Sequence, residues 1–285
     1  MTADVVLRPM ERAELDVLVG WAADEGWNPG LHDADVFWDT DPEGFVAAEQ
    51  AGRLVGGGSI VSYDGRFGFM GFFIVAAAHR GRGLGRRLWV HRRDALRARL
   101  RPGAAIGMDG VFEMQPFYAE GGFAFAGRDL RFEGVGAAAA VPDRLVDARE
   151  VPFDALLAYD AAHFPAPRPR FLARWIDPPG GRALAAVADG ALRGYGVVRP
   201  CRRGFKVGPL FAADAAVAED LLRGLGDAAR GAPLFLDVPE ENGAAMALAA
   251  AHGMREVFGC ARMYLGPPPR LPVQEVFGVT TFELG

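Results

Sequence analysis

A segment rich in glycine and arginine, HRGRGLGRRLW at residues 79–89, combines bare backbone with positive charge. It follows an apolar run ending at Ile74-Val75 and precedes a stretch with helical spacing. The first N–H groups of a helix have no intrahelical partner, and they lie at the positive end of the helix dipole. Glycine lets an anion approach these groups closely, and arginine adds charge-assisted hydrogen bonds. The segment therefore predicts a phosphate site, and we expect it to hold a pyrophosphate.

Two common phosphate motifs do not fit this segment. No Gly-Lys-Ser/Thr sequence closes it, which excludes the spacing of a P-loop. A dinucleotide-binding glycine loop belongs near the start of a parallel sheet. This loop instead follows residues 44–75, which we interpret as an antiparallel meander with turns at Ala51-Gly52 and Asp64-Gly65.

Two motifs together resemble the GCN5-related N-acetyltransferases (GNAT). Arg80-x-x-Gly83-x-Gly85 is similar to the family's acetyl-CoA pyrophosphate loop, and Tyr118 with the Gly-Phe pair at 122–123 is similar to its Y-x-x-x-G-F motif. More narrowly, EGWNPG at residues 25–30 and the ending VFGVTTFELG resemble a tandem subfamily whose second copy is a YitH-type acetyltransferase domain. The resemblance covers essentially the whole chain.

The resemblance implies acetyl-CoA as cosubstrate and no metal. Main-chain N–H groups of the loop would hold the pyrophosphate, and those of the preceding strand would polarise the thioester carbonyl. The cofactor contacts expected on this basis are Phe73, Ile74, Val75, Arg80, Gly81, Arg82, Gly83, Leu84, Gly85 and Arg86. The Arg86 side chain could equally belong to a solvated helix face. Where the family often has asparagine before the tyrosine, this sequence has VFEMQPFY, in which Gln115 could substitute.

Tyr118 is the candidate general acid, because the family's tyrosine commonly protonates the departing thiolate. A free thiol has a pKa of about 8.5, so this proton is useful though not mandatory. The alternative for Tyr118 is a half-buried tyrosine that packs on the sheet. Asp109 and Glu113 lie where the acceptor should enter, and each could accept a proton or attract a cationic amine. We favour a catalytic role for Asp109 and a solvated loop carboxylate for Glu113.

The acceptor is expected to be a primary amine of a small molecule. Residues expected to line its entrance are Trp27, Asn28 and Asp33 from the N-terminal half and Asp237 and Glu240 from the C-terminal half. So many carboxylates hint at a cationic amine. We expect direct transfer in a ternary complex, because Cys201 and Cys260 both belong to the half that lacks the glycine loop. A non-catalytic acyl-CoA sensor, and an enzyme with a longer acyl group or a hydroxyl acceptor, remain as alternatives.

The order of elements predicts an α/β (α+β) chain of two tandem GNAT-like domains, each a mixed, mostly antiparallel sheet flanked by helices. We expect helices at 11–26, from 84 onward and at 115–123, and strands at 5–10, 104–108 and 125–134. The second half repeats this order, and DGALRGYGVV repeats QAGRLVGGGSIV with its glycines offset by 138 positions. The alternative is that the two halves are unrelated α/β folds whose strands and helices follow in a similar order.

These patterns divide the chain into a GNAT domain at 1–136 that binds acetyl-CoA and a degenerate, YitH-type domain at 137–285, joined by the linker GVGAAAAVPDR. In the second copy AADAAVAEDLL replaces the glycine loop, and Ala249 falls at the tyrosine position. We therefore expect the second copy to shape the structure or the acceptor site.

Composition excludes several classes of protein. A chain of 285 residues with 51% hydrophobic residues is long enough for two domains with cores. Its net charge of −5 argues against nucleic-acid binding, and no apolar run approaches the length of a membrane span. Two distant cysteines and no basic leader before an apolar stretch predict a cytoplasmic protein without zinc or disulfides. The sequence gives no indication of oligomeric state.

Overall fold

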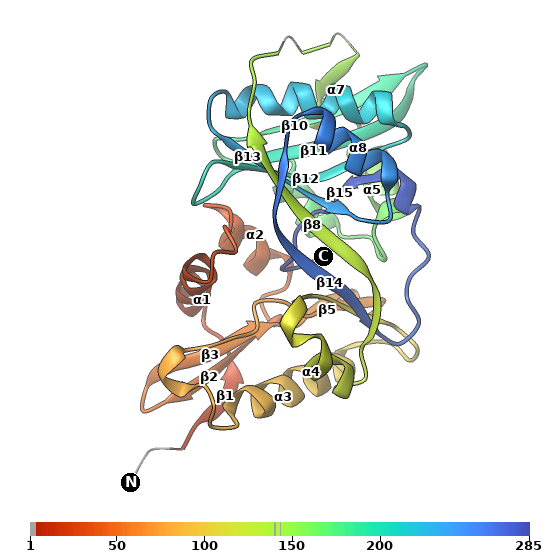
Figure 1. Ribbon diagram of the computed structural model, residues 1–285. Coiled ribbons are helices and arrows are strands. Elements are labelled where there is room, and N and C mark those ends of the chain that lie inside the picture. The colour runs from red at the N-terminus through yellow and green to blue at the C-terminus, as the bar shows by residue number, and fades with distance from the viewer. Residues whose placement is uncertain (1–3, 140, 143) are drawn as a thin grey trace.

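The computed structural model describes residues 4–139, 141–142 and 144–285. It places two α/β halves one above the other, joined by two long strands (Figure 1). The linker expected at 134–144 includes positions 140 and 143, which lie outside the described residues.

The N-terminal half contains the strands and helices predicted around the glycine loop, with one addition, the short helix α2. Its helices are α1 (Arg12–Asp24), α2 (Asp33–Thr40), α3 (Leu84–Arg99) and α4 (Gln115–Glu120). Its strands are β1 (Val6–Pro9), β2 (Phe45–Gln50), β3 (Arg53–Ser59), β4 (Val61–Tyr63), β5 (Phe67–Phe69), β6 (Ile74–Val75), β7 (Ile106–Val111) and β8 (Ala124–Val135).

The C-terminal half follows the same order of elements. Its helices are α5 (Phe153–His163), α6 (Pro169–Trp175), α7 (Ala215–Gly226) and α8 (Gly243–Ala251). Its strands are β9 (Leu145–Asp147), β10 (Arg182–Ala188), β11 (Ala191–Pro200), β12 (Phe205–Ala212), β13 (Pro233–Pro239), β14 (Arg255–Leu265) and β15 (Val276–Gly278).

Corresponding hairpins in the two halves have the same backbone geometry. Ala51 and Gly52 have φ values of 52° and 74° in the β2–β3 turn, and Asp189 and Gly190 have 50° and 73° in the β10–β11 turn. Two positive φ values in succession define the turn that suits the twist of a two-residue hairpin. The register shift between Ala48 and Glu49 recurs 138 residues later, between Ala186 and Val187. This geometry supports an internal duplication.

The final long strand of the chain lies in the sheet of the N-terminal half. β14 pairs antiparallel with β7, with Arg262 opposite Asp109, and also pairs with β8. β8 in turn pairs with β13 of the C-terminal half. Over the described residues, this makes one sheet of eleven strands that runs through both halves, beside a second sheet of four. β8 and β14 cross between the halves side by side (Figure 1).

The last ten residues, 276–285, form a segment that we call the C-terminal strap, and all ten are buried. β15 pairs with β12, and the carbonyl of Leu284 accepts a hydrogen bond of 2.8 Å from the Tyr63 hydroxyl of the N-terminal half. The chain terminus therefore lies between the halves (Figure 1). Burial of each large apolar side chain of the strap contributes about 1.5–3 kcal/mol to folding stability. The strap therefore helps to hold the two halves together.

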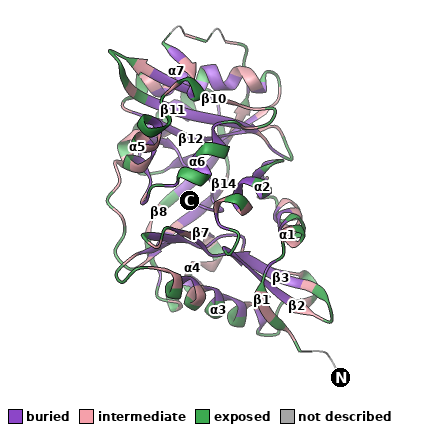
Figure 2. Cartoon of the chain, turned by 180° about the vertical axis from the view of Figure 1, so that it is seen from behind, coloured by how far each residue is buried: buried purple, intermediate pink, exposed green. Residues whose placement is uncertain are grey.

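The two halves share one hydrophobic core. Its buried side chains include Phe37 and Phe72 from the N-terminal half and Trp175 and Leu284 from the C-terminal half. The Phe37 and Trp175 rings stack with centroids 6.1 Å apart. The strands are mostly buried, whereas the outward faces of α3 and α7 are exposed (Figure 2). No helix of the described chain is both long enough and apolar enough to span a bilayer.

Buried ion pairs also join the halves. Asp33 on α2 binds Arg199 on β11 with an oxygen–nitrogen distance of 2.8 Å, and it accepts a second hydrogen bond of 2.8 Å from the Gly30 amide. Both side chains are almost fully buried. A buried ion pair adds little to folding stability relative to an apolar pair of the same size. Removing one partner lowers the stability strongly, because the other charge stays buried without a counter-charge.

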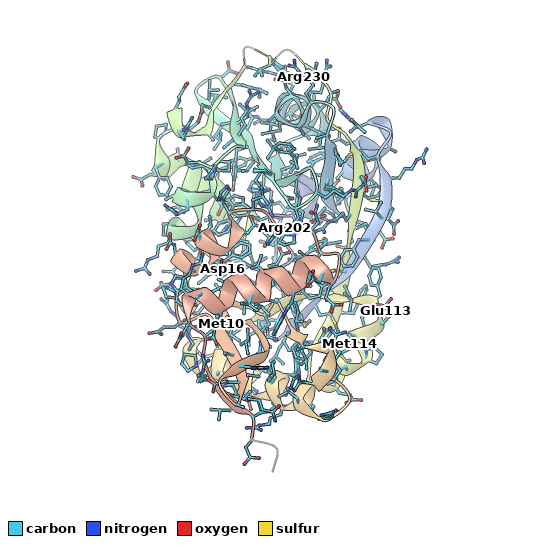
Figure 3. All side chains as sticks on the ribbon, turned by 90° about the vertical axis from the view of Figure 1, so that its left-hand side faces the viewer. Met10, Asp16, Glu113, Met114, Arg202 and Arg230 are labelled. Carbon is cyan, nitrogen blue, oxygen red and sulfur yellow. The ribbon has the colours of Figure 1, made fainter. Side chains whose placement is uncertain are left out.

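We therefore expect Asp33→Asn to lower the free energy of unfolding by about 3–5 kcal/mol, since Arg199 would lose its counter-charge. Urea denaturation followed by circular dichroism measures this. The matched control is Asp16→Asn, because Asp16 makes an exposed pair with Arg12 on the surface of α1 (Figure 3). That change should cost no more than about 0.5 kcal/mol. Equal stabilities of the two variants would contradict the role of Asp33.

Candidate active site

A cavity of about 380 Å³ opens where β6 and β7 separate. β5 and β7 pair in parallel at two positions, Gly68 with Ile106 and Phe69 with Gly107. The next strand, β6, pairs with β3 instead, so the sheet opens between β6 and β7. The predicted site residues that line this cavity are Trp27, Phe73, Ile74, Val75, Arg80, Gly81, Gly85, Arg86, Asp109 and Tyr118. The fold therefore brings together the glycine loop, the strand before it, the tyrosine and one of the two candidate carboxylates.

The glycine loop presents unpaired amides at one end of the cavity. Gly83 is the N-cap of α3 with φ +80°, and no side chain caps the helix. The first amide of the helix that finds a main-chain acceptor is that of Arg87, which donates to the Gly83 carbonyl. Within the described chain, the N–H groups from Gly81 to Arg86 have no acceptor. This is the arrangement that binds a phosphate.

The arginine side chains of the loop have different surroundings. Arg80 donates 2.7 Å to the Val75 carbonyl and pairs with Glu25, so its side chain fixes the loop. Arg86 pairs with Glu120 at 2.6 Å on the exposed face of α3. Arg82 is exposed, and no described group pairs with it. Among the three, Arg82 is the side chain available to an anion.

The irregular segment 70–73 before β6, which we call the bulge, has Phe72 at φ +50° and leaves further amides facing the cavity. The Phe73 N–H has no acceptor in the described part of the chain, and Ala76 N–H donates to Val55. Since amides alternate along a strand, Val75 N–H faces away from β3, toward the cavity. These groups could hold a carbonyl oxygen.

Arg92 fixes this bulge, and the sequence analysis missed it. Its Nη2 donates 2.6 Å to the Ser59 carbonyl and 2.5 Å to the Gly71 carbonyl. Burial lowers the pKa of Arg92 to about 9, which still leaves it charged at neutral pH. The signal in the sequence is its helical spacing with Leu88 and Leu96, which places a charge on the buried face of α3.

Tyr118 lies on α4 across the cavity from the bulge. Its ring packs on Trp89 at 4.9 Å, and Gly110 makes room for it because a Cβ there would overlap the ring. Burial raises the pKa of Tyr118 to about 12, so the hydroxyl is protonated at neutral pH. No described group hydrogen-bonds that hydroxyl, which leaves it available to a ligand.

Asp109 reaches the cavity from β7, but both of its oxygens bind Arg262 of β14, at 2.6 and 2.7 Å. Asp129 of β8 lies 3.3 Å from the same guanidinium. Burial raises the pKa of Asp109 above its usual range, with Arg262 acting against the shift and Asp129 adding to it. One arginine thus serves two buried carboxylates.

The C-terminal half contributes to the cavity, but through other residues than Asp237 and Glu240, which the sequence had suggested. Phe258 and Cys260 line it from β14, and Phe282 and Glu283 line it from the C-terminal strap. Cys260 therefore lies in the site although it belongs to the half without a glycine loop. Burial raises the pKa of the Cys260 thiol well above its usual value, so it is a poor nucleophile.

The other predicted acceptor residues lie away from the cavity. Asn28 exchanges two hydrogen bonds with the main chain of Arg203. Asp33 pairs with Arg199, as described above, and Asp237 forms a buried pair with Arg131 at 2.6 Å. Glu240 pairs with Arg128 at the surface, and Glu113 is exposed beside Met114 (Figure 3). The lining at the acceptor end is therefore mainly aromatic and sulfur-containing, with few carboxylates.

The corresponding opening in the C-terminal half is filled by the chain itself. β15 pairs with β12 at Leu210 and Phe211, and the Val279 amide donates 2.8 Å to the Asp237 carbonyl of β13. The helix after β12 is capped by its own carboxylate, because Asp214 accepts 3.0 Å from the Val217 amide. The second copy thus lacks the opening of the first, and a side chain caps its helix. Among the described residues, no cluster of His, Cys, Asp and Glu could hold a metal ion.

Comparisons with known proteins identify both halves. The model of the acetyltransferase (GNAT) family matches residues 12–123, and the model of an acetyltransferase (GNAT) domain matches residues 156–278. The two matches are consecutive and cover most of the chain.

Individual relatives extend this likeness over the full length. Holothin acyltransferase of a Pseudoalteromonas strain is 26% identical over 98% of this chain and 94% of its own. The uncharacterized N-acetyltransferase YitH of Bacillus subtilis is 29% identical over 68% of this chain and 71% of its own. A crystal structure of a putative acetyltransferase from Pyrococcus horikoshii superimposes with a TM-score of 0.84 at 22% identity, covering 99% of this chain and 96% of that one. The chain is a tandem member of the GNAT acetyltransferase family, with the fold expected from its sequence.

Proposed function

We propose that this protein transfers an acetyl group from acetyl-CoA to a primary amine of a small molecule, directly and in a ternary complex. Membership of the family indicates acyl-CoA-dependent acyl transfer. The observation that carries the proposal is the juxtaposition, in one cavity, of the unpaired amides of the glycine loop and the free Tyr118 hydroxyl.

In this proposal the pyrophosphate of acetyl-CoA binds the amides from Gly81 to Arg86, with Arg82 adding positive charge. The acyl-carrying arm then lies between β6 and β7, where the sheet is open. The amides of Phe73 and Val75 hold the thioester carbonyl oxygen and stabilise the negative charge that develops on it during attack.

Tyr118 is the proposed general acid. Its raised pKa keeps the proton on the hydroxyl until the thiolate departs. A sensor that only binds acyl-CoA would have no use for such a group. Direct transfer is favoured over a covalent acyl-enzyme because the Cys260 thiol is held protonated by burial.

The acceptor enters from the side of the cavity lined by Trp27, Phe258 and Phe282. These rings favour an amine with an apolar body over a polycation. The relative named as a holothin acyltransferase supports small-molecule acylation and leaves room for acyl groups other than acetyl.

The loop can be tested with Gly85→Val. A Cβ at Gly85 meets only Phe73, at 3.7 Å, so the change fits the fold but fills the space beside the amides. We expect acetyl-CoA affinity to fall by about 10–100-fold, as for the loss of one or two charge-assisted hydrogen bonds of ~1.5–3 kcal/mol. Isothermal titration calorimetry measures this.

The matched control is Gly243→Val, in the first turn of α8, where an added Cβ meets nothing within 4 Å. It should leave acetyl-CoA affinity unchanged. Wild-type affinity in the Gly85 variant would refute the assignment of the loop.

We further expect Tyr118→Phe to reduce kcat by about 10²-fold while acetyl-CoA affinity stays the same. Because the pKa of Tyr118 is raised to about 12, its ionisation should not lower the wild-type rate as the pH rises from 7 to 10. Release of CoA thiol with a panel of amines, followed across this pH range, measures both effects. A variant as active as the wild type would exclude Tyr118 as the acid.

A further inference from the structure

The C-terminal strap, VFGVTTFELG, carries a carboxylate into the cavity of the N-terminal half. The strap passes both sheet openings, filling the one in the C-terminal half with β15 and reaching the other with Phe282 and Glu283. Glu283 is 3% exposed and lines the cavity beside the bulge. The proposed function above assigns no role to this residue.

The main chain of Glu283 is held at one position on the bulge. Its carbonyl accepts a 3.3 Å hydrogen bond from the Ser59 hydroxyl, which itself accepts 2.8 Å from the Gly71 amide. Gly71 must be glycine, because a Cβ there would overlap the Glu283 carbonyl. The same Gly71 carbonyl is bound by Arg92. Glu283 is therefore positioned by the groups that position the Phe73 amide.

The Glu283 carboxylate differs from the other two carboxylates that line the cavity. Glu25 is bound to Arg80 at the exposed end, and both oxygens of Asp109 are bound to Arg262. Oε2 of Glu283 is buried and has no hydrogen-bond partner among the described residues. A buried carboxylate oxygen without a partner is costly, which points to a donor supplied by a ligand.

Charges from both halves act on Glu283. Arg131 of β8, Arg199 of β11 and Lys206 of β12 interact with it electrostatically. These cations are themselves balanced in part by Asp237 and Asp33. Three cations against two carboxylates leave a net positive charge facing the Glu283 side chain.

We propose that the Glu283 carboxylate binds the acceptor amine and takes its proton during acyl transfer, so that the strap supplies the base to the active site. This inference rests on the proposed acyl transfer. The amine nitrogen bonds to the thioester carbon and gives a proton to Glu283, the carbon–sulfur bond breaks, and Tyr118 gives its proton to the sulfur. The products are an amide and CoA thiol, and the proton on Glu283 returns to Tyr118 through solvent. Asp109 remains bound to Arg262 throughout.

The test uses the full-length protein with acetyl-CoA, and tryptamine and spermidine within a panel of primary amines as probes. Glu283→Gln keeps the size of the side chain and removes its charge. We expect kcat to fall by ~10²-fold or more, as for the loss of a general base, with acetyl-CoA affinity within about twofold of the wild type. Deleting the strap would unfold the protein, so a point substitution is needed.

Two further variants separate chemistry from folding. Glu283→Ala should lose the same activity and regain part of it when formate is added, because formate restores a carboxylate to the vacated space. A merely structural role would not respond to formate. Glu275→Gln is the matched control, since Glu275 precedes the strap, binds His163 and lies outside the cavity. It should retain wild-type kcat.

The outcomes distinguish this inference from the proposed function. Turnover by the wild type with an unchanged kcat in Glu283→Gln would overturn the role of Glu283 alone, as would a loss of activity confined to Asp109→Asn. If the wild type binds acetyl-CoA but releases no CoA with any amine, the proposed function fails and the role of Glu283 fails with it.

Discussion

The pairing of β14 with β7 is the constraint on which the rest of this structure depends. Through it, a strand from the C-terminal half forms one wall of the cavity in the N-terminal half. The pairing places Arg262 against Asp109 and Asp129, and it brings Phe258 and Cys260 to the acceptor side. It also directs the chain after β14 back across the interface, where the C-terminal strap lies. The second copy is therefore part of the candidate active site of the first.

The two copies differ in what caps the helix that follows the central strands. In the N-terminal half the N-cap is Gly83, which has no side chain and leaves the first amides of α3 open. In the C-terminal half the N-cap is Asp214, whose own carboxylate takes the place of an external anion. The sheets of the two halves also differ. In the C-terminal half β15 pairs with β12, whereas the corresponding position beside β6 in the N-terminal half is open. Both differences disfavour an anion and an extended ligand at this place in the second copy.

Local features of the sequence predicted much of the fold and several of the residues that line the cavity on the side of the glycine loop. Glycines at positive φ, such as Gly52 and Gly83, and the helical spacing after Leu84 are properties of short segments, so they can be recognised without knowing the tertiary structure. The acceptor side could not be predicted in this way. Asp33 and Asp237 are carboxylates on segments expected at the site, but each finds a buried arginine elsewhere. Strand partners also escape prediction, because β8 and β14 follow equivalent helices and either could complete the N-terminal sheet.

The position of β14 also has a consequence for synthesis of the chain. β7 ends at Val111, and its neighbour in the sheet begins at Arg255, so more than half of the polypeptide must be made between them. Until then a nascent chain would expose an unpaired sheet edge, which is a hazard for aggregation. Contacts between such distant segments also form slowly. The N-terminal half consequently completes the wall of its candidate site only after β14 has been made, although its glycine loop is made much earlier.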